Sequence, residues 1–509
     1  MDRRTFLKIV GMGSISVAAG CTPDPYGGPR PDKNLFAPVH HPDDMVTGDA
    51  TWYASTCREC PAGCGILAKN REGRIIKVEG NPDHPINRGT LCIRGQAALQ
   101  GIYNPDRLQM PQLKENGRWR PVSFVEAERI LQNRIDRAVS AGENRIRMMT
   151  ETVGEVFAKL LVESLSQWNS PPPLTFELFA YESLKAANGS VFGVQGLPSY
   201  RIEESDVLVG FGAEFLETWL SPVEYARKFK AMHALQGDTK GKFFHVGPHQ
   251  SLTGANADLW LACHPGGEAV VAMGLIREIL KHQNSEGATP SALNDGLAEI
   301  VAPYTREEVA ARAGVAPERY EALLQALLQA ERPLILGSGA GSAANALPTD
   351  TAANLLNRLL DPGLARIDFT RRHRVETADG RKQVLEFFEV LDREPVDLLL
   401  LNNVNPVYAL PRGAALESVL NRSSLFVVSF SSCMDETAKM ADMVLPVRLP
   451  LENWDEYGGH SQLVSTLQPA MGRLTDAPFL GDVFLRALEG KTRGRDKYKS
   501  YLVSNLIAR

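Results

Sequence analysis

Four cysteines near the start of the chain constrain the fold more than any other feature of the sequence. Three of them lie in one short loop and the fourth follows after a long gap, in the order Cys57-x2-Cys60-x3-Cys64-x27-Cys92. The loop also contains a proline and two glycines, which let the backbone fold around a bound group and aim N–H groups at sulfur. The chain must therefore bring a distant segment back to a tight loop at a shared site.

Four thiolates suit either zinc or an iron-sulfur cluster, and the residue types alone leave both open. Structural zinc sites usually pair two C-x2-C turns, whereas three cysteines in one loop plus a remote fourth favour a cubane. Disulfides are the third option for an exported chain, but seven cysteines are few for a disulfide framework in 509 residues. We expect one 4Fe-4S cluster held by Cys57, Cys60, Cys64 and Cys92.

The first 21 residues have the features of an export signal. Arg3 and Arg4 precede Phe-Leu-Lys and a weakly apolar stretch that ends in small residues. The paired arginines resemble the twin-arginine signal, which exports proteins already folded around a cofactor. The alternative is a basic amphipathic helix, which Gly11 and Gly13 disfavour. We expect residues 1–21 to be a twin-arginine signal and the protein to lie on the periplasmic side of the cytoplasmic membrane.

Cys21 follows Ala-Ala-Gly, as at a lipoprotein cleavage site, although Ala18 stands where leucine is usual. A plain cleavage nearby is the alternative, and it would leave Cys21 without a role. Residues 22–50 are rich in Pro, Gly and Asp and show no periodicity, so we expect an extended tether. A lipid on Cys21 and this tether would anchor the protein to the membrane.

The charge balance limits the classes of partner. The net charge is -5, with acidic and basic residues interspersed, so a nucleic-acid partner is not expected. Five basic residues gather near the end of the chain, where they form either a solvated helix face or a docking surface for an acidic partner. They are Lys491, Arg493, Arg495, Lys497 and Lys499.

Short apolar segments alternate with helical stretches through the rest of the chain. The expected strands are 145–149, 174–179, 207–211, 242–246, 333–336, 398–401 and 425–429. Strands buried on both faces and separated by helices predict parallel sheets. The fold class is therefore α/β, with a small N-terminal iron-sulfur domain followed by two Rossmann-like doubly wound domains. A glycine-rich turn at 337–341 could hold a phosphate, although tight packing explains it equally well.

The domain boundaries follow from the same pattern. We expect the iron-sulfur domain at 51–110, with a return at about 447–472. The first α/β domain is expected at 111–180 and 331–446, the second at 181–330, and a basic tail at 473–509.

Several further motifs make the chain resemble the molybdopterin oxidoreductase family. They are Ile93-Arg94-Gly95-Gln96, Asn104-Pro105-Asp106-Arg107-Leu108, His264-Pro265-Gly266-Gly267-Glu268 and Ala441-Asp442-Met443-Val444-Leu445-Pro446. The resemblance implies that the N-terminal domain holds a 4Fe-4S cluster and that loops at the sheet ends hold two pterin guanine dinucleotides. It places Arg94 between cluster and pterin. It also implies that Gly212, His264 to Glu268 and Asn403 to Asn405 line the pterin cleft, although each is equally an ordinary strand-to-helix turn.

Two departures from the family stand out. The family's C-terminal dinucleotide-binding barrel would need many more residues than follow Pro469, so we expect it to be absent. Catalytic members also supply a Cys, selenocysteine, Ser or Asp ligand to molybdenum, and the corresponding stretch here is Phe179-Ala180-Tyr181-Glu182-Ser183. Ser183 or Glu182 could serve chemically, but neither has a matching motif around it. Cys263 and Cys433 are expected to be inert core thiols.

In both departures the chain resembles one branch of the family, the large iron-sulfur subunit of alternative complex III and related membrane quinone reductase complexes. That resemblance implies a subunit without the molybdenum bis-pterin guanine dinucleotide. The implied partners are a ferredoxin-like multi-cluster iron-sulfur subunit, a quinone-binding integral membrane subunit and c-type cytochromes. We expect an electron-transfer subunit without its own substrate site, in which Arg94 tunes the cluster.

Two alternatives stay open. One is a catalytic molybdopterin-dependent reductase of the polysulfide, thiosulfate or arsenate type, in which Ser183, His264, Glu268 and Asn405 would serve a bound pterin. The other is a structural scaffold subunit whose cluster only stabilises the assembly.

Overall fold

The computed structural model describes most of the chain beyond residue 47. The described ranges are 48–285 except for 236 and 238, then 292–338, 345–411, 416–491 and 497–508. The expected export signal, Cys21 and nearly all of the tether lie outside these ranges. The same holds for most of the glycine-rich turn at 337–341 and for Arg493 and Arg495.

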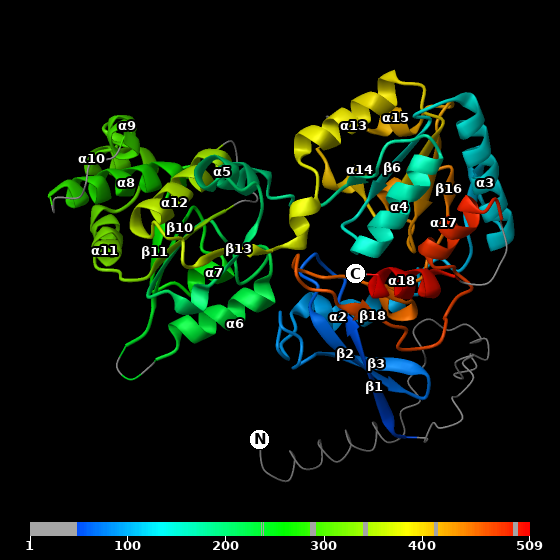
Figure 1. The fold of residues 1–509 in the computed structure, drawn as a ribbon, viewed down its shortest axis with the longest axis horizontal. Helices are drawn as coiled ribbons and strands as arrows, with labels where there is room; N and C mark the ends of the chain where they lie inside the picture. Colours follow the sequence, from blue (N-terminus) through cyan, green and yellow to red (C-terminus); the bar gives the residue numbers. More distant parts are fainter. Residues whose placement is uncertain are drawn as a thin grey trace, which may run out of the picture. The chain divides into compact units, whose positions relative to one another are not determined.

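An antiparallel sheet opens the described part of the chain (Figure 1). Its strands β1 (Ala50–Thr56), β2 (Gly65–Arg71) and β3 (Arg74–Gly80) pair in sequence order. Helix α2 (Ile93–Ile102) packs against β3. The hairpin of β17 (Asp455–Glu456) and β18 (Thr466–Leu467) contacts β1, and Leu451, Ala470 and Met471 join the same apolar core as Cys57 and Cys64. A segment from near the end of the chain thus completes this small N-terminal region.

A seven-stranded sheet forms the core of one α/β domain. It consists of β5 (Arg118–Pro121), β4 (Gln112–Glu115), β16 (Met443–Val444), β15 (Phe426–Phe430), β14 (Leu398–Asn402), β6 (Ile146–Thr150) and β7 (Leu174–Thr175), in that spatial order. The strands from β16 to β7 run parallel, whereas β4 is antiparallel to β16 and forms a hairpin with β5.

Helices cover both faces of this sheet because its strands are apolar on both faces. In β14, Leu398 and Leu400 pack into one core while Leu399 and Leu401 pack into the other. The first core lies under α3 (Phe124–Ala141), α4 (Glu155–Gln167), α17 (Leu480–Leu488) and α18 (Tyr498–Ile507). The second lies under α13 (Arg381–Arg393), α15 (Leu416–Leu420) and α16 (Glu436–Met440).

A four-stranded parallel sheet forms the core of the other α/β domain. Its order is β11 (Leu259–Ala262), β10 (Lys242–Gly247), β9 (Val207–Phe211) and β12 (Pro333–Gly337). One face packs on α8 (Glu268–Ser285), α10 (Arg306–Ala313), α11 (Pro317–Leu328) and α12 (Ala346–Leu360). The other packs on α5 (Glu182–Phe192) and α6 (Pro222–His233).

The remaining elements are short or lie at the edges of these layers. They are β8 (Pro198–Tyr200), which pairs with β13 (Ile367–Arg372), the helices α7 (Leu252–Ala255), α9 (Ala292–Val301) and α14 (Pro406–Ala409), and the 3-10 turns Ile202–Glu204, Arg374–Thr377 and Pro450–Glu452. Within the described ranges, the helices lack the combination of length and apolarity that crossing a membrane requires.

The fold class expected from the sequence is confirmed, and each of the seven expected strands coincides with an observed one to within a few residues. The expected boundary between the α/β domains at residue 331 differs from the structure. Strand β12 pairs with β9, so residues 333–337 belong to the four-stranded sheet, and α12 covers that same sheet. Parallel neighbours come from distant parts of the chain, and strand pairing rather than sequence order decides the boundary.

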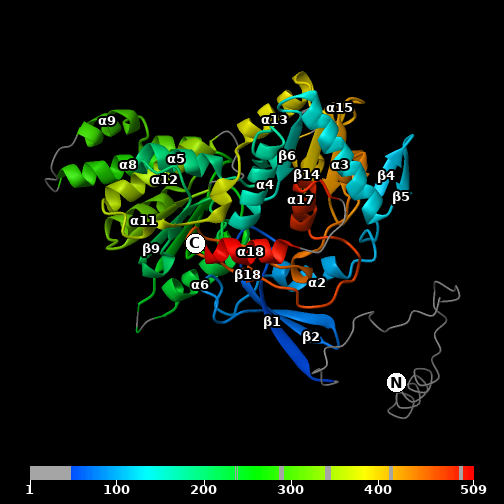
Figure 2. The same ribbon diagram turned by 45° about the vertical axis from the view of Figure 1, so that its right-hand side comes forward.

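The expected basic tail is largely a packed part of the fold. Phe484 of α17 and Tyr498 of α18 are buried in the core of the seven-stranded sheet. Lys491 and Lys497 both pair with Glu489, and the Lys499 ammonium lies 4.0 Å from the centre of the Trp454 ring. Helix α18 also contacts β17 of the returning segment, and it lies close to β18 in Figures 1 and 2.

Candidate metal centre and adjoining cavity

The three clustered cysteines occupy the connection between two paired strands. Cys57 directly follows β1 and Cys64 directly precedes β2, and the backbone N–H of Cys57 donates to the carbonyl of Cys64 at 2.8 Å. Gly63 has a φ of 62°, a left-handed conformation that glycine adopts without strain. Cys92 caps the N-terminus of α2. The hairpin and the helix start thus hold the four cysteines in one region.

Electrostatic coupling shows that the four thiols lie near one another. Burial raises the pKa of Cys57 to about 12, and negative charge on Cys60 and Cys92 raises it further. The pKa of Cys64 is raised by burial and then by charge on Cys60, Cys57 and Cys92. Four neighbouring thiolates, two of them buried, are unfavourable without a cation between them, so the site fits a cationic iron centre that the cysteines would hold.

Across the described ranges, no three His, Cys, Asp or Glu side chains converge closely enough to share one metal ion. All six cysteines in the described part of the chain have free thiols. When bound, the cluster would supply one-electron chemistry.

Residues 457–459 of the returning segment clamp the cysteine loop. The Tyr457 hydroxyl donates to the Pro61 carbonyl at 2.9 Å, and the Arg58 guanidinium lies 3.7 Å from the centre of the Tyr457 ring. A Cβ atom on Gly459 would come within 1.9 Å of the Ala62 carbonyl oxygen, so only glycine permits this approach. The sequence predicted a return at 447–472, and the segment from Glu452 to Tyr457 was among the motifs of the resemblance, but Gly458 and Gly459 were not singled out.

Arg94 lies on the solvent side of the cluster region, in the exposed first turn of α2. Its positive charge lowers the pKa of Cys60 against the larger effect of burial, and it also lowers the pKa of Glu59, which burial raises. The pKa of Tyr181, raised by burial to about 12, responds to the charges of both Cys60 and Arg94. Arg94 is thus close enough to act on the cysteines electrostatically.

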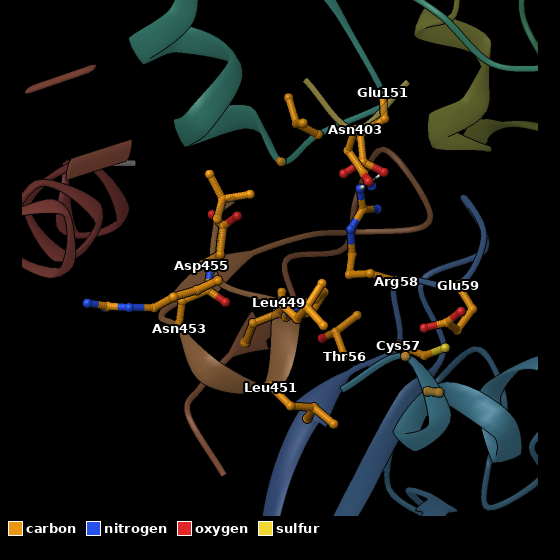
Figure 3. Close-up of a pocket in the computed structure, with 18 of the residues that line it drawn as sticks. Thr56, Cys57, Arg58, Glu59, Glu151, Asn403, Leu449, Leu451, Asn453 and Asp455 are labelled. Carbon is orange, nitrogen blue, oxygen red and sulfur yellow. Dashed lines mark ion pairs between the residues drawn. The ribbon is translucent and has the colours of Figure 1, made fainter. Parts of the chain in front are cut away.

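A cavity of about 470 Å³ adjoins the cysteines (Figure 3). Figure 3 shows Arg58 extending from the cysteine loop toward Glu151 and Asn403, at the ends of β6 and β14, while Asp455 enters from the returning segment. The guanidinium of Arg58 lies 3.6 Å from the Glu151 carboxylate and donates to the Thr152 carbonyl. The cavity therefore lies at the carboxyl ends of parallel strands, where α/β folds bind ligands.

The lining of this cavity is acidic. Four carboxylates face two guanidiniums, and the residues are Glu59, Glu151, Glu177 and Asp455 against Arg58 and Arg448. Burial raises the pKa of Glu151, and it raises the pKa of Asp455 to about 7. A pterin guanine dinucleotide carries a pyrophosphate and dithiolene sulfurs, and this lining would repel both. These residues do not fit that cofactor.

The raised pKa of Asp455 gives a prediction about stability. The Asp455 carboxylate accepts hydrogen bonds from the Tyr498 hydroxyl and the Glu456 N–H, both at 2.9 Å, and asparagine keeps an acceptor for both. Because the folded protein holds the Asp455 proton up to about pH 7, ionisation of this group destabilises the fold as pH rises from about 4 to 7. We expect Asp455→Asn to stabilise the protein by about 2 kcal/mol at pH 8, less than the full shift implies because cavity water screens the charge.

Thermal unfolding of the two proteins across this pH range tests the Asp455 prediction. The gain in stability of Asp455→Asn over the wild type should disappear near pH 4. At that pH wild-type Asp455 is protonated in the folded state, and its ionisation in the unfolded state contributes little to the free energy of unfolding. An equal gain at pH 4 and pH 8 would show that the effect is not electrostatic.

A second cavity, of about 370 Å³, lies at the carboxyl ends of the four-stranded sheet. Gly212, Gly266 and Glu268 line it, as the resemblance implied. His245 and Glu268 are nearly fully buried there, and Nδ1 of His245 and Oε2 of Glu268 have no hydrogen-bond partner among the described residues. Burial lowers the pKa of His245 to about 4, so its imidazole is neutral. This cavity, unlike the first, offers uncharged and acceptor groups that suit a planar polar ligand.

The other residues expected to serve a pterin make structural contacts instead. His264 is exposed and packs on Gly314. Asn405 caps α14, donates to Glu436 at 2.7 Å and accepts from the Thr437 hydroxyl at 2.7 Å, so its amide is fully used. Asn403 does line the first cavity.

Tyr181, Glu182 and Ser183 lie in the stretch that the resemblance aligns with the molybdenum ligand of catalytic members, and the side chains of Tyr181 and Glu182 make hydrogen bonds within the protein. The Tyr181 hydroxyl accepts from the Leu220 N–H at 2.8 Å and donates to the Thr218 carbonyl at 3.2 Å, which fixes the ring. Glu182 accepts from the Arg381 N–H at the start of α13. Ser183 lies in the first turn of α5.

The two remaining cysteines differ from each other. Cys263 is buried, and burial raises its pKa to about 12, in line with an inert core thiol. Cys433 was expected to be buried as well, but the structure shows it exposed in the turn after β15. A strand end at the edge of a sheet reaches the surface, which the apolar sequence around Cys433 did not reveal.

Two family models match consecutive parts of the chain, the iron-sulfur region and the region that follows it. Residues 50–104 match the molybdopterin oxidoreductase Fe4S4 domain, and residues 107–477 match the molybdopterin oxidoreductase domain. The first match supports one 4Fe-4S cluster in this chain.

Two relatives and one solved structure extend over most of the chain. The menaquinone reductase, molybdopterin-binding-like subunit of Nitratidesulfovibrio vulgaris is 30% identical over 517 residues, covering 96% of this chain and 72% of the relative. A nitrate reductase of Symbiobacterium thermophilum is 23% identical, covering 99% of this chain and 72% of the relative. The structure of acetylene hydratase from Pelobacter acetylenicus shares the fold, with a TM-score of 0.67 at 16% identity over 86% of this chain and 68% of the hydratase. The chain belongs to the molybdopterin oxidoreductase family.

Proposed function

We propose that this protein is the electron-transfer iron-sulfur subunit of a membrane-associated quinone or quinol oxidoreductase complex of the alternative complex III type, and that it works without a molybdenum cofactor. One observation carries the proposal: a four-cysteine site lies beside a cavity whose lining is acidic. The cysteines fit a cluster, whereas the carboxylates of Glu151 and Glu177 disfavour the anionic cofactor that would use that cavity.

The relatives support the coarser part of the proposal. A relative covered over nearly the whole of this chain is a menaquinone reductase subunit described as molybdopterin-binding-like. By this analogy the partners are a ferredoxin-like multi-cluster subunit, a quinone-binding integral membrane subunit and c-type cytochromes. The N-terminal signal and Cys21 add the proposal of twin-arginine export and a lipid anchor on the periplasmic side of the membrane.

Electron transfer then needs only the cluster and its surroundings. The cysteines hold the iron, and the backbone N–H groups of the loop set its potential. The guanidinium of Arg94 favours the more negative, reduced state because its charge acts on Cys60. Arg94 is a positioning and tuning residue in this proposal, with no contact to a substrate.

Freeze-quench electron paramagnetic resonance of the purified complex tests this function. Anaerobic addition of menaquinol or an oxidised cytochrome c should change the oxidation state of this subunit's cluster during turnover. A cluster that keeps one oxidation state throughout turnover would contradict electron transfer and leave the scaffold role.

A second candidate, a catalytic molybdenum reductase, has one favouring observation. The cavity at the four-stranded sheet keeps buried His245 and Glu268, each with a polar atom that lacks a partner among the described residues, and these atoms suit a polar ligand. Reduction of polysulfide, thiosulfate or arsenate by the purified chain, with molybdenum bound, would establish this candidate and contradict the first.

A further inference from the structure

A third cavity, of about 370 Å³, is rich in basic side chains. It lies where the loop before Cys92 meets helix α6 and strand β13, and it shares no lining residue with the cavity beside the cysteines. Five basic side chains line it: Arg88, Arg201, Arg227, Lys228 and Arg371.

Two of these five charges are already matched by carboxylates. Arg201 lies 3.1 Å from Asp368, and Lys228 lies 3.1 Å from the buried Glu224. Two further carboxylates, Glu203 and Glu204, lie in the exposed part of the lining. Glu203 comes within 3.9 Å of Lys228.

The other three guanidiniums are poorly matched. Among the described residues, no hydrogen bond to the side chains of Arg88 or Arg227 is present, and Nε of Arg227 is buried without a partner. Burial lowers the pKa of Arg227 and the nearby charges of Arg88 and Arg371 lower it further, against the smaller opposing effect of Glu224 and Glu203. Arg371 reaches Glu224 only at 3.7 Å, and that carboxylate also accepts from His460 at 2.8 Å. Guanidiniums held together in this way repel one another unless an anion lies between them.

We propose that this cavity binds an oxyanion, a phosphate or carboxylate group of a small solute, between Arg88, Arg227 and Arg371. The planar fork of arginine matches both groups with paired charge-assisted hydrogen bonds. The volume of the cavity admits a compact ligand rather than a folded domain.

The oxyanion site is connected to the cluster by direct packing. The His84 ring lies against Gly65, where an added Cβ would come within 2.3 Å of it, and Gly65 follows Cys64. Pro85, the next residue after His84, lines the cavity. A bound anion adds negative charge on this side, so it disfavours reduction, and reduction in turn weakens anion binding.

Isothermal titration calorimetry of the cluster-loaded protein in its complex tests the site. The probes are inorganic phosphate and succinate, each titrated in a chloride buffer of the same ionic strength. Tighter binding of phosphate than succinate identifies a phosphate site, and the reverse identifies a carboxylate site. Arg227→Gln and, as a second variant on an exposed loop, Arg88→Gln should each weaken binding about tenfold or more. Lys230→Gln, on the same helix but outside the cavity, is the matched control and should bind like wild type.

Redox titration followed by electron paramagnetic resonance gives the second readout. The cluster of the wild type should show a lower midpoint potential with the bound anion, and Arg227→Gln should show no such change. The proposed oxyanion site would be overturned if neither probe gave binding heat. It would also be overturned if the probes bound equally well to Arg227→Gln, Arg88→Gln and Lys230→Gln. Binding without any change in midpoint potential would overturn its link to the cluster. Neither result depends on the presence or absence of molybdenum, so this test and that of the proposed function can fail separately.

Discussion

Replacing Cys64 by serine should abolish the cluster. Cys64 is nearly fully buried between Gly63 and the start of β2, so no water or other side chain can take its place at the iron. We expect the iron content to fall from about four atoms per chain to a small residue, with loss of the visible absorbance of the cluster. The unfolding temperature should fall as well, because metal binding contributes directly to the stability of such a region.

Cys433→Ser is the matched control for this variant. Cys433 is exposed and lies outside the four-cysteine site, so its replacement should leave iron, absorbance and unfolding temperature unchanged. Full iron content in Cys64→Ser, or an equal loss in both variants, would contradict the assignment of the cluster ligands.

Replacing Glu452 by glutamine should be strongly destabilising. The Arg107 guanidinium and the Glu452 carboxylate form a bidentate pair with distances of 2.9 and 2.5 Å, and both side chains are almost completely buried. The pair joins the segment after α2 to the returning segment that closes the cysteine loop. Glutamine would leave the Arg107 charge buried without its counter-ion, which costs about 3–5 kcal/mol.

The exposed pair of Arg120 and Glu115, 3.0 Å apart, provides the control. Glu115→Gln should leave the denaturation midpoint within experimental error, because water screens exposed charges. Chemical denaturation of both variants, followed by cluster absorbance and by circular dichroism, separates local opening from global unfolding. Equal midpoints for wild type and Glu452→Gln would show that the buried pair does not hold the returning segment.

The sequence revealed the strands because their signal is local. Runs such as Leu398 to Leu401 are apolar on both faces, which only a strand covered on both sides by helices explains. The sheet to which β12 belongs could not be read in this way, since its partner β9 lies more than a hundred residues earlier. Helix α18 was likewise missed as core, because the basic residues just before it dominate that part of the sequence while Tyr498 and Leu502 provide the buried contacts.

The residues of the candidate site also differ in whether a local sequence pattern could predict them. The spacing of the four cysteines was enough to point to a cluster, because ligands in one loop leave a pattern in the sequence. The acidic lining of the neighbouring cavity left no such pattern, since Glu151, Glu177 and Asp455 come from separate parts of the chain. Asn405 stands in a loop at a sheet end, and the sequence did not reveal that its side-chain oxygen accepts from Thr437 and its side-chain N–H donates to Glu436.

Metal and pterin analysis of the purified complex tests the central claim most directly. Inductively coupled plasma mass spectrometry would measure iron, molybdenum and tungsten per chain, and acid extraction would detect any pterin by its fluorescence. We expect iron in the amount that this subunit and its partners require, with neither molybdenum nor tungsten and no extractable pterin. Molybdenum in equal amount to this chain, together with a pterin guanine dinucleotide, would contradict the claim that the protein transfers electrons through its cluster alone.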